Sequence, residues 1–231
     1  MELLNLRNSL LTFSLVAIAS LSSGMLTACS TASQNETQAQ NTTAVNTSDN
    51  KQMNHEGGMN HSMAMDLGPA DANYDLRFID AMTPHHQGAV EMAKVALQKS
   101  QRPQIKKLAN DIIKDQNKEI AQMKQWRQAW YPKAGDKPMA YDAQMGHMME
   151  MSSDQKKGMM MNMPLGAADA DFDLRFINAM LPHHEGAVTM SQDALSKSNR
   201  SDIKKLAQSI ITSQQAEIQQ MKQWRQEWYK K

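Results

Sequence analysis

The chain has little cysteine, few aromatic residues and almost no net charge. Cys29 is the only cysteine among 231 residues, so no intramolecular disulfide can form, and a blue-copper centre in the folded part would lack its thiolate. Four residues each of Trp, Tyr and Phe argue against an aromatic-rich barrel or sandwich. A formal net charge of +1, with both signs mixed along the chain, argues against electrostatic binding of nucleic acid.

Methionine is the residue in excess. The chain contains 21 methionines, although its 41% hydrophobic and 21% charged content is ordinary for a globular protein. Together with neutral imidazole, thioethers form a soft ligand set that suits Cu(I) better than Mg, Ca or Mn. Methionine-dense stretches are therefore candidates for metal binding as well as for core packing.

A stretch that begins at Phe78 occurs again at Phe176. A shift of 98 residues aligns the two copies, and each contains a Pro-His-His triplet. These triplets hold four of the seven histidines, namely His85, His86, His183 and His184. Roughly two-thirds of the aligned positions in the surrounding segments are identical, which indicates a duplicated unit.

The histidine pairs lie on the inward side of a predicted helix. At about 100° per residue, that side contains Phe78, Met82, His85, His86, Ala89, Met92, Ala93 and Ala96. A single inward histidine is more often a satisfied core residue than a ligand. Two adjacent histidines with thioethers on the same face, repeated in both copies, favour a copper-binding interpretation.

Residues 1–29 have the features of a signal peptide. Arg7 precedes an apolar stretch from Leu10 to Leu21, which is too short for a membrane-spanning helix. The segment ends in Leu26-Thr27-Ala28-Cys29, which resembles a bacterial lipobox and predicts lipidation of Cys29. Cleavage after Ala32 is the alternative, and it would discard the cysteine. Both alternatives predict export.

Residues 30–64 are predicted to be a disordered tether that carries a metal-binding arm. The first part is rich in Gln, Asn, Thr, Ser and Ala and cannot bury a core. The arm, which reaches the first residue of the repeat, contains Met53, His55, Met59, His61, Met63 and Met65. A plain disordered tail is the alternative, but such tails are usually poor in methionine.

Residues 65–131 are predicted to form an antiparallel helical hairpin. Asp71 is a candidate N-cap for a helix from about residue 72 to residue 100, with Pro84 in its interior. A second helix follows from residue 102 or 103 to residue 131. The register of the hairpin brings Gln116 and Glu119 level with the histidines, where they either hold imidazole nitrogens or meet only water.

Residues 132–162 are predicted to be a turn-rich linker with a methionine-rich segment. Met145, His147 and Met148 are candidate metal ligands within it. Core filling or an adaptable hydrophobic surface is the alternative use of these methionines. Gly146 and Gly158 interrupt any helix that the methionines favour.

Residues 163–231 repeat the hairpin, and Gln214 and Glu217 repeat Gln116 and Glu119. One hairpin of about 60 residues buries little apolar surface by itself. Two packed face to face predict an all-α four-helix bundle with the histidine pairs in related positions across it. If each pair forms its own site, substitutions in the two copies should act separately and add.

The repeated motifs resemble those of the bacterial family of unknown function numbered 305, across residues 65–131 and again across residues 163–229. The pattern is Met-x-Pro-His-His-x-x-Ala-x-x-Met followed by Gln-x-x-Glu-Ile-x-x-Met-x-x-Trp. The resemblance implies a ferritin-like four-helix bundle, a periplasmic or lumenal location and copper binding, as in its exported, methionine-rich copper-resistance members. The site residues that it implies are Met82, His85, His86, Met92, Met180, His183, His184 and Met190.

We therefore expect a non-enzymatic protein that binds copper, with Cu(I) favoured over Cu(II) and with Ag(I) as an analogue. Its partners would be copper ions and a copper efflux or delivery protein, with a lipid anchor as its only membrane contact. A ferritin-like metal oxidase is an alternative, but neither copy has the expected Glu-x-x-His on a core face. A methionine-based oxidant sink is a third class, and it leaves the inward histidines unexplained.

Overall fold

The computed structural model describes residues 65–161 and 163–231. The predicted signal peptide, the lipobox cysteine Cys29, the tether and the arm residues Met53, His55, Met59, His61 and Met63 lie outside this part of the chain. Met65, the last residue of the predicted arm, is described and is half-buried against the core.

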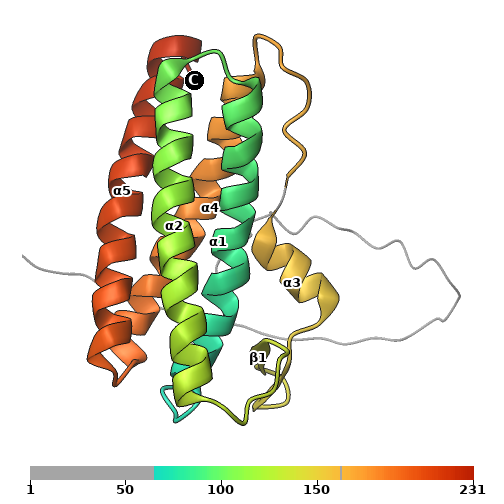
Figure 1. The fold of residues 1–231 in the computed structure, drawn as a ribbon, viewed down its shortest axis with the longest axis vertical. Coiled ribbons are helices and arrows are strands. Elements are labelled where there is room, and N and C mark those ends of the chain that lie inside the picture. Colours follow the sequence, from blue (N-terminus) through green and yellow to red (C-terminus); the bar gives the residue numbers. More distant parts are fainter. Residues whose placement is uncertain (1–64, 162) are drawn as a thin grey trace, which may run out of the picture. The chain divides into compact units, whose positions relative to one another are not determined.

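Four long helices form the bundle that the sequence predicts (Figure 1). Their bounds are Tyr74–Lys99 for α1, Pro103–Trp130 for α2, Phe172–Lys197 for α4 and Ser201–Tyr229 for α5. Helix α1 packs against α2 and α4, and α4 packs against α5. Each hairpin is antiparallel, and α1 and α4 also run in opposite directions (Figure 1).

The first helix begins later than predicted, because Asp71 is not its N-cap. The N-cap is Asn73, whose backbone N–H donates to the Asp71 carboxylate. Arg77 also binds Asp71 and the carbonyl of Leu67, so Asp71 closes the turn before the helix. In the second repeat the N-cap is Asp171, which aligns with Asn73.

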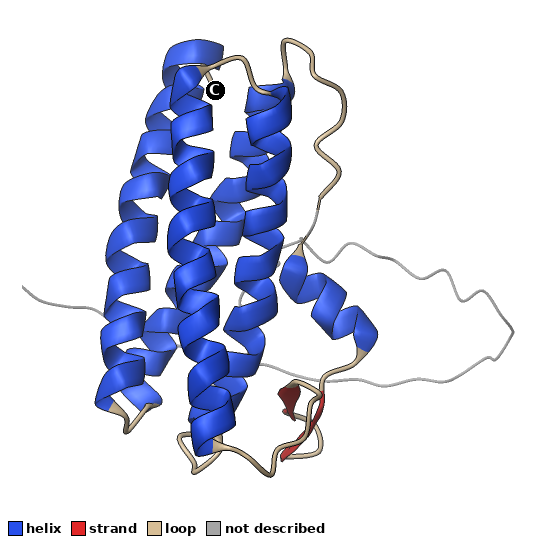
Figure 2. Ribbon diagram, viewed as in Figure 1, coloured by secondary structure: helices blue, strands red, loops and turns tan. Residues whose placement is uncertain are grey.

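The segment between the hairpins is more ordered than a turn-rich linker. It contains a two-stranded antiparallel sheet of Met139–Asp142 (β1) and His147–Glu150 (β2), followed by helix α3 at Ser153–Met160 (Figure 2). A capping box starts α3, because Ser152 and Gln155 each bond the other's backbone N–H. Gly158 lies within α3 and does not interrupt it.

This sheet and α3 are fastened to the first repeat. Asp80 of α1 accepts a hydrogen bond from the backbone N–H of Met139 and pairs with Arg127 of α2. In the second repeat the residue at the position of Asp80 is Asn178, a neutral side chain. Farther along α1, Gly88 approaches the end of α3 so closely that a Cβ there would lie 1.6 Å from the Met160 carbonyl oxygen.

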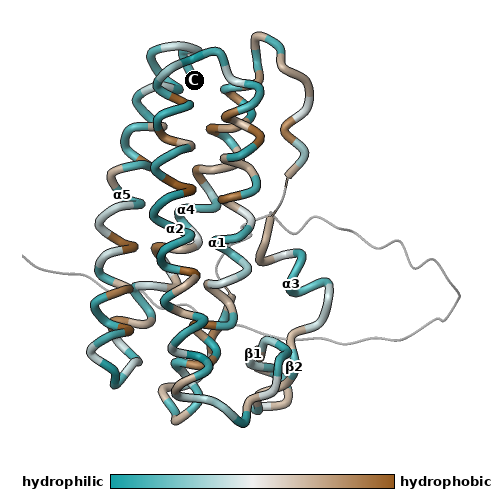
Figure 3. The backbone as a smooth tube through the Cα atoms, in the orientation of Figure 1, coloured by the Kyte–Doolittle hydropathy of each residue, from teal (hydrophilic) through white to brown (hydrophobic). Residues whose placement is uncertain are grey.

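The bundle interior consists of two hydrophobic clusters. One includes Met92 and Ile112 from the first hairpin and Met180 and Met221 from the second. The other includes Met82 and Met123 with Met190 and Ile210. In α1 and α4 the paired histidines lie between the stretches that contribute to the two clusters. Figure 3 shows hydrophobic and hydrophilic residues alternating along each long helix, as expected for amphipathic packing.

None of the helices in the described ranges combines the length and the hydrophobicity needed to cross a membrane.

Candidate metal centre

Four histidines form a buried layer in the middle of the bundle. His85 and His86 come from α1, and His183 and His184 come from α4. Each of these side chains is at most 1% exposed. Adjacent helical residues differ by about 100°, so one histidine of each pair faces the opposite copy and the other faces its own hairpin partner. We call these four residues the histidine layer.

The two repeats meet at His85 and His183. Their ring centroids are 3.8 Å apart and the rings are perpendicular. None of their four ring nitrogens has a hydrogen-bond partner among the described residues. The sequence predicted related positions for the two pairs, but not this direct contact. The contact joins the two copies into one layer and does not favour two independent sites.

Burial keeps the central pair uncharged. It lowers the pKa of His85 to about 3, and the neighbouring His86 and His184 act in the same direction. Burial, together with His85, also lowers the pKa of His183 well below its ordinary value. At neutral pH each ring therefore keeps one unprotonated nitrogen, which is the form that binds a metal ion.

The outer histidines are each held by a carboxylate from the partner helix. The Nε2 atom of His86 lies 2.7 Å from Oε2 of Glu119, and Nε2 of His184 lies 2.7 Å from Oε2 of Glu217. A neutral imidazole that donates its Nε2 proton to a carboxylate carries its lone pair on Nδ1. In both residues Nδ1 is buried without a partner. The hairpin register predicted from the sequence therefore places Glu119 and Glu217 correctly, level with the histidines.

The unpartnered nitrogens carry a free-energy cost in the metal-free protein. A buried polar atom without a partner destabilises a fold by about 1–3 kcal/mol. Besides the histidine nitrogens, Oε1 of Gln116 and of Gln214 is buried without a partner. These two glutamines are buried and supply no hydrogen bond to an imidazole among the described residues. A soft cation coordinated by the imidazoles would satisfy the nitrogens and offset part of this cost.

The predicted methionine ligands lie at two different distances from the layer. Met82 and Met180 precede the histidines by about one helical turn, or roughly 5 Å along the axis. Met92 and Met190 follow them by about two turns, roughly 10 Å along the axis. All four side chains are at most 1% exposed. Met82 and Met180 are therefore the thioethers placed to contact an ion in the layer, whereas Met92 and Met190 pack the core.

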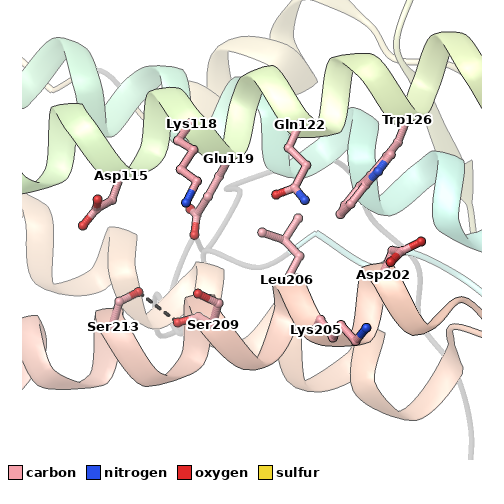
Figure 4. Close-up of a pocket in the computed structure, with 10 residues that line it drawn as sticks. All are labelled: Asp115, Lys118, Glu119, Gln122, Trp126, Asp202, Lys205, Leu206, Ser209 and Ser213. Atoms are coloured by element: carbon pink, nitrogen blue, oxygen red, sulfur yellow. Dashed lines mark hydrogen bonds between the residues drawn. The ribbon is translucent and has the colours of Figure 1, made fainter.

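A groove between α2 and α5 leads from solvent to one of the carboxylates. It has a volume of about 400 Å³ and is lined by Glu119, Gln122 and Trp126 on one side and by Leu206 and Ser209 on the other (Figure 4). Glu119 is 13% exposed while it bonds the fully buried His86. This carboxylate therefore connects the groove to the histidine layer.

The layer needs a rearrangement before it can hold an ion. Among the described residues, no three His, Cys, Asp or Glu side chains already converge as metal ligands. The rings of His85 and His183 are in direct perpendicular contact between the two pairs. The residues that would hold a soft ion are the histidines of the layer, and the nearest thioethers along the helices are Met82 and Met180, which belong to the two hydrophobic clusters on either side of the layer.

The predicted ligands between the hairpins are only partly grouped. His147 is exposed and Met148 is half-buried on β2, while Met145 lies in the connecting turn and is 66% exposed. Met151 and Met159 are buried in the second hydrophobic cluster, so core filling accounts for these two. Met149 belongs to the same methionine-rich segment and is 36% exposed. The strand period of two in His147-Met148-Met149 puts it on the same face of β2 as His147.

Comparisons with known proteins agree with the fold. The family model described as "Domain of unknown function (DUF305)" matches residues 75–225. The structure of CopM in the Cu(II)-bound form is 44% identical, with a TM-score of 0.54, and the alignment covers 67% of this chain and 97% of that chain. CopM in the Cu(I)-bound form is 41% identical with the same coverages and a TM-score of 0.52.

A short curated match comes from a virus. "Uncharacterized protein L153" of Acanthamoeba polyphaga mimivirus is 45% identical over 49 residues. The aligned stretch is 21% of this chain and 32% of that protein, so this chain spans about a third of the viral protein's length.

Proposed function

The chain belongs to the DUF305 family, and we propose that it is an exported, non-enzymatic protein that binds copper for sequestration or delivery. The observation that carries this proposal is the histidine layer. The layer places imidazole nitrogens without hydrogen-bond partners at the centre of the bundle, and a carboxylate binds the second nitrogen of two of the rings. Hydrophobic burial alone gives no reason to retain so many unsatisfied polar atoms.

The relatives point to the same class of ion. Structures of CopM, which is 41–44% identical to this chain, were solved in Cu(II)-, Cu(I)- and Ag-bound forms. For this chain we propose a preference for Cu(I), because the donors within reach of the layer are neutral imidazoles and thioethers in a dry interior. Ag(I) is the corresponding air-stable probe.

The binding step is ligand exchange without net redox chemistry. The carboxylates of Glu119 and Glu217 accept from Nε2 of His86 and His184, so Nδ1 is the nitrogen of each of these rings that can coordinate the ion. His85 and His183 are neutral, so these two rings need not release a proton when they bind the ion near neutral pH. The groove at Glu119 offers an access route. We further propose that the methionine arm and the exposed methionines capture the ion before it reaches the interior.

The proposal is tested by anaerobic Cu(I) titration against a chromophoric chelator. His85→Leu and His183→Leu should each lower the affinity of the interior site by about tenfold or more. Because the two rings contact each other, the double variant should lose little beyond either single variant. Additive losses would instead support two separate sites.

A core variant provides the matched control. Ile112 is 1% exposed and belongs to a neighbouring hydrophobic cluster. Ile112→Ala should destabilise the protein by about 2–5 kcal/mol without changing the Cu(I) affinity of the folded fraction. If His85→Leu behaves like this control, the histidines have only a structural role.

A further inference from the structure

The sheet between the two hairpins carries soft donors outside the bundle. Met145 and Met149 are among the three most exposed large hydrophobic residues of the described chain, and His147 between them is exposed as well. Exposure of a methionine costs hydrophobic free energy that burial would recover. Met151 and Met159 of the same segment are buried in the core, so their burial stabilises the fold. Packing therefore leaves Met145 and Met149 unexplained.

Strand geometry separates these donors into two faces. Successive side chains of a strand point to opposite faces, so His147 and Met149 share one face of β2 and Met148 lies on the other. The register supports this division, because Met148 is opposite Tyr141, whose ring lies against Gly68 and near Arg77. The α-carbons of His147 and Met149 are roughly 7 Å apart at the usual rise per residue. Side chains leaning toward each other can span an ion at that separation.

The ring of His147 is already oriented for coordination through Nε2. Its Nδ1 atom lies 3.2 Å from the Met148 carbonyl oxygen, an acceptor only. A neutral ring in this arrangement donates its Nδ1 proton and leaves the lone pair on Nε2, toward solvent. Metal-binding histidines characteristically have a backbone carbonyl or carboxylate as the partner of the second ring nitrogen.

The backbone that carries these residues is held in place. The Asp142 carboxylate accepts hydrogen bonds from the backbone N–H groups of Gln144 and Met145, which fixes the turn. At the other end of β1, Met139 donates its N–H to Asp80 of α1. A preorganised backbone lowers the entropy that binding an ion would otherwise lose.

We propose that His147 and Met149, joined by Met145 from the turn, form a second, solvent-exposed site for a soft monovalent ion, Cu(I) or Ag(I). This site is separate from the histidine layer; it names ligands for the capture step and rests on the proposed function for the choice of ion. One imidazole and two thioethers are a poor set for hard cations such as Mg or Ca. The sequence suggested Met145, His147 and Met148 as ligands. In the proposed site Met149 takes the place of Met148, because Met148 lies on the other face of β2.

The test is silver titration of the full mature protein labelled with ¹³C at its methionine methyl groups. Signals are assigned with Met145→Leu, Met148→Leu and Met149→Leu, three substitutions of similar volume. The methyl signals of Met149 and Met145 should shift together, while that of Met148 stays in place. His147→Ala should raise the silver concentration for half of the Met149 shift by at least about tenfold. Met148→Leu is the matched control and should leave that concentration unchanged.

The outcomes separate this inference from the interior proposal. Histidine ¹⁵N signals of His85 and His183 report the histidine layer in the same titration. If those signals respond while Met149 stays fixed up to saturation, the surface site is absent and the interior site remains. If Met149 shifts together with Met148, or independently of His147, the proposed ligand set is wrong. If Met149 responds and the interior histidines do not, only the interior proposal fails.

Discussion

His85 and His183 stand ring edge to ring face across the interface between the two repeats, with centroids 3.8 Å apart. Duplication alone would allow each repeat to keep its own histidine pair and its own ion. The contact instead makes each copy contribute half of one layer. A change in one copy is therefore expected to alter the environment of the other.

The buried histidines should make the metal-free protein less stable as the pH falls. The pKa of His85 is about 3 in the folded protein and about 6.5 in the unfolded chain, so the unfolded chain takes up the proton first. The contribution that neutral His85 makes to the free energy of unfolding is fully present above about pH 6.5 and is lost as the pH falls toward about 3. Between pH 7 and pH 5, protonation of His85 in the unfolded chain should lower the free energy of unfolding by about 2 kcal/mol.

Denaturant unfolding at both pH values measures this loss. His85→Leu should remove about 2 kcal/mol of the pH dependence. Ile112→Ala, a substitution of a buried residue that does not titrate, should lower the stability by the same amount at both pH values. An equal pH dependence in wild type and His85→Leu would contradict the buried neutral histidine.

Much of this bundle was predictable because its signals are local and repeated. The apolar period and the turn near residue 101 gave the helices to within a few residues, and counting from that turn brought Glu119 to His86. The contact of His85 with His183 was not predictable in the same way. It depends on how two hairpins dock, and no local period of the sequence encodes that.

The ordered segment between the hairpins was missed for a different reason. Its strands have only four residues each, and its helix has eight, so each is too short to show a clear period. Its position depends on Asp80 and Gly88, which belong to α1 and lie far away in sequence. Ser152 and Gln155 form the one local signal, a capping box that predicts the start of α3.

The carboxylates behind the outer histidines should control copper affinity. Glu119→Gln retains a hydrogen-bonding side chain but removes the carboxylate that accepts from Nε2 of His86. Cu(I) affinity should fall about 10–100-fold, and Glu217→Gln should have a similar effect through His184. Glu150→Gln removes the same charge from an exposed ion pair with Lys137 and should change nothing. If Glu119→Gln and Glu217→Gln bind Cu(I) as tightly as Glu150→Gln does, the carboxylates beside the outer histidines do not control copper affinity.

Gly88 should be required for docking of α3. A Cβ at this position would meet the Met160 carbonyl, so Gly88→Ala should displace α3 and cost about 1–3 kcal/mol. Limited proteolysis should then cut within residues 153–161 while the four long helices remain. Gly158→Ala adds a Cβ with no neighbour within 4 Å and should stabilise α3 by about 0.5–1 kcal/mol. Proteolysis that is the same in Gly88→Ala and wild type would show that the contact is not needed.

Export and lipidation remain predictions from the N-terminal sequence. Metabolic labelling with a radioactive fatty acid should mark the wild-type protein in the membrane fraction. Cys29→Ser should abolish the label and leave unprocessed precursor or soluble protein. A wild-type protein that is unlabelled and soluble outside the cytoplasm would leave export intact and remove the lipid anchor.

The central claim is that a soft ion binds within the histidine layer, and an anomalous-scattering crystal structure of the silver-loaded protein tests it most directly. We predict a silver peak between α1 and α4, with ring nitrogens from both repeats as ligands and with the rings of His85 and His183 rotated out of their perpendicular contact. Silver found only at surface methionines, with that contact intact at saturating silver, would contradict the account.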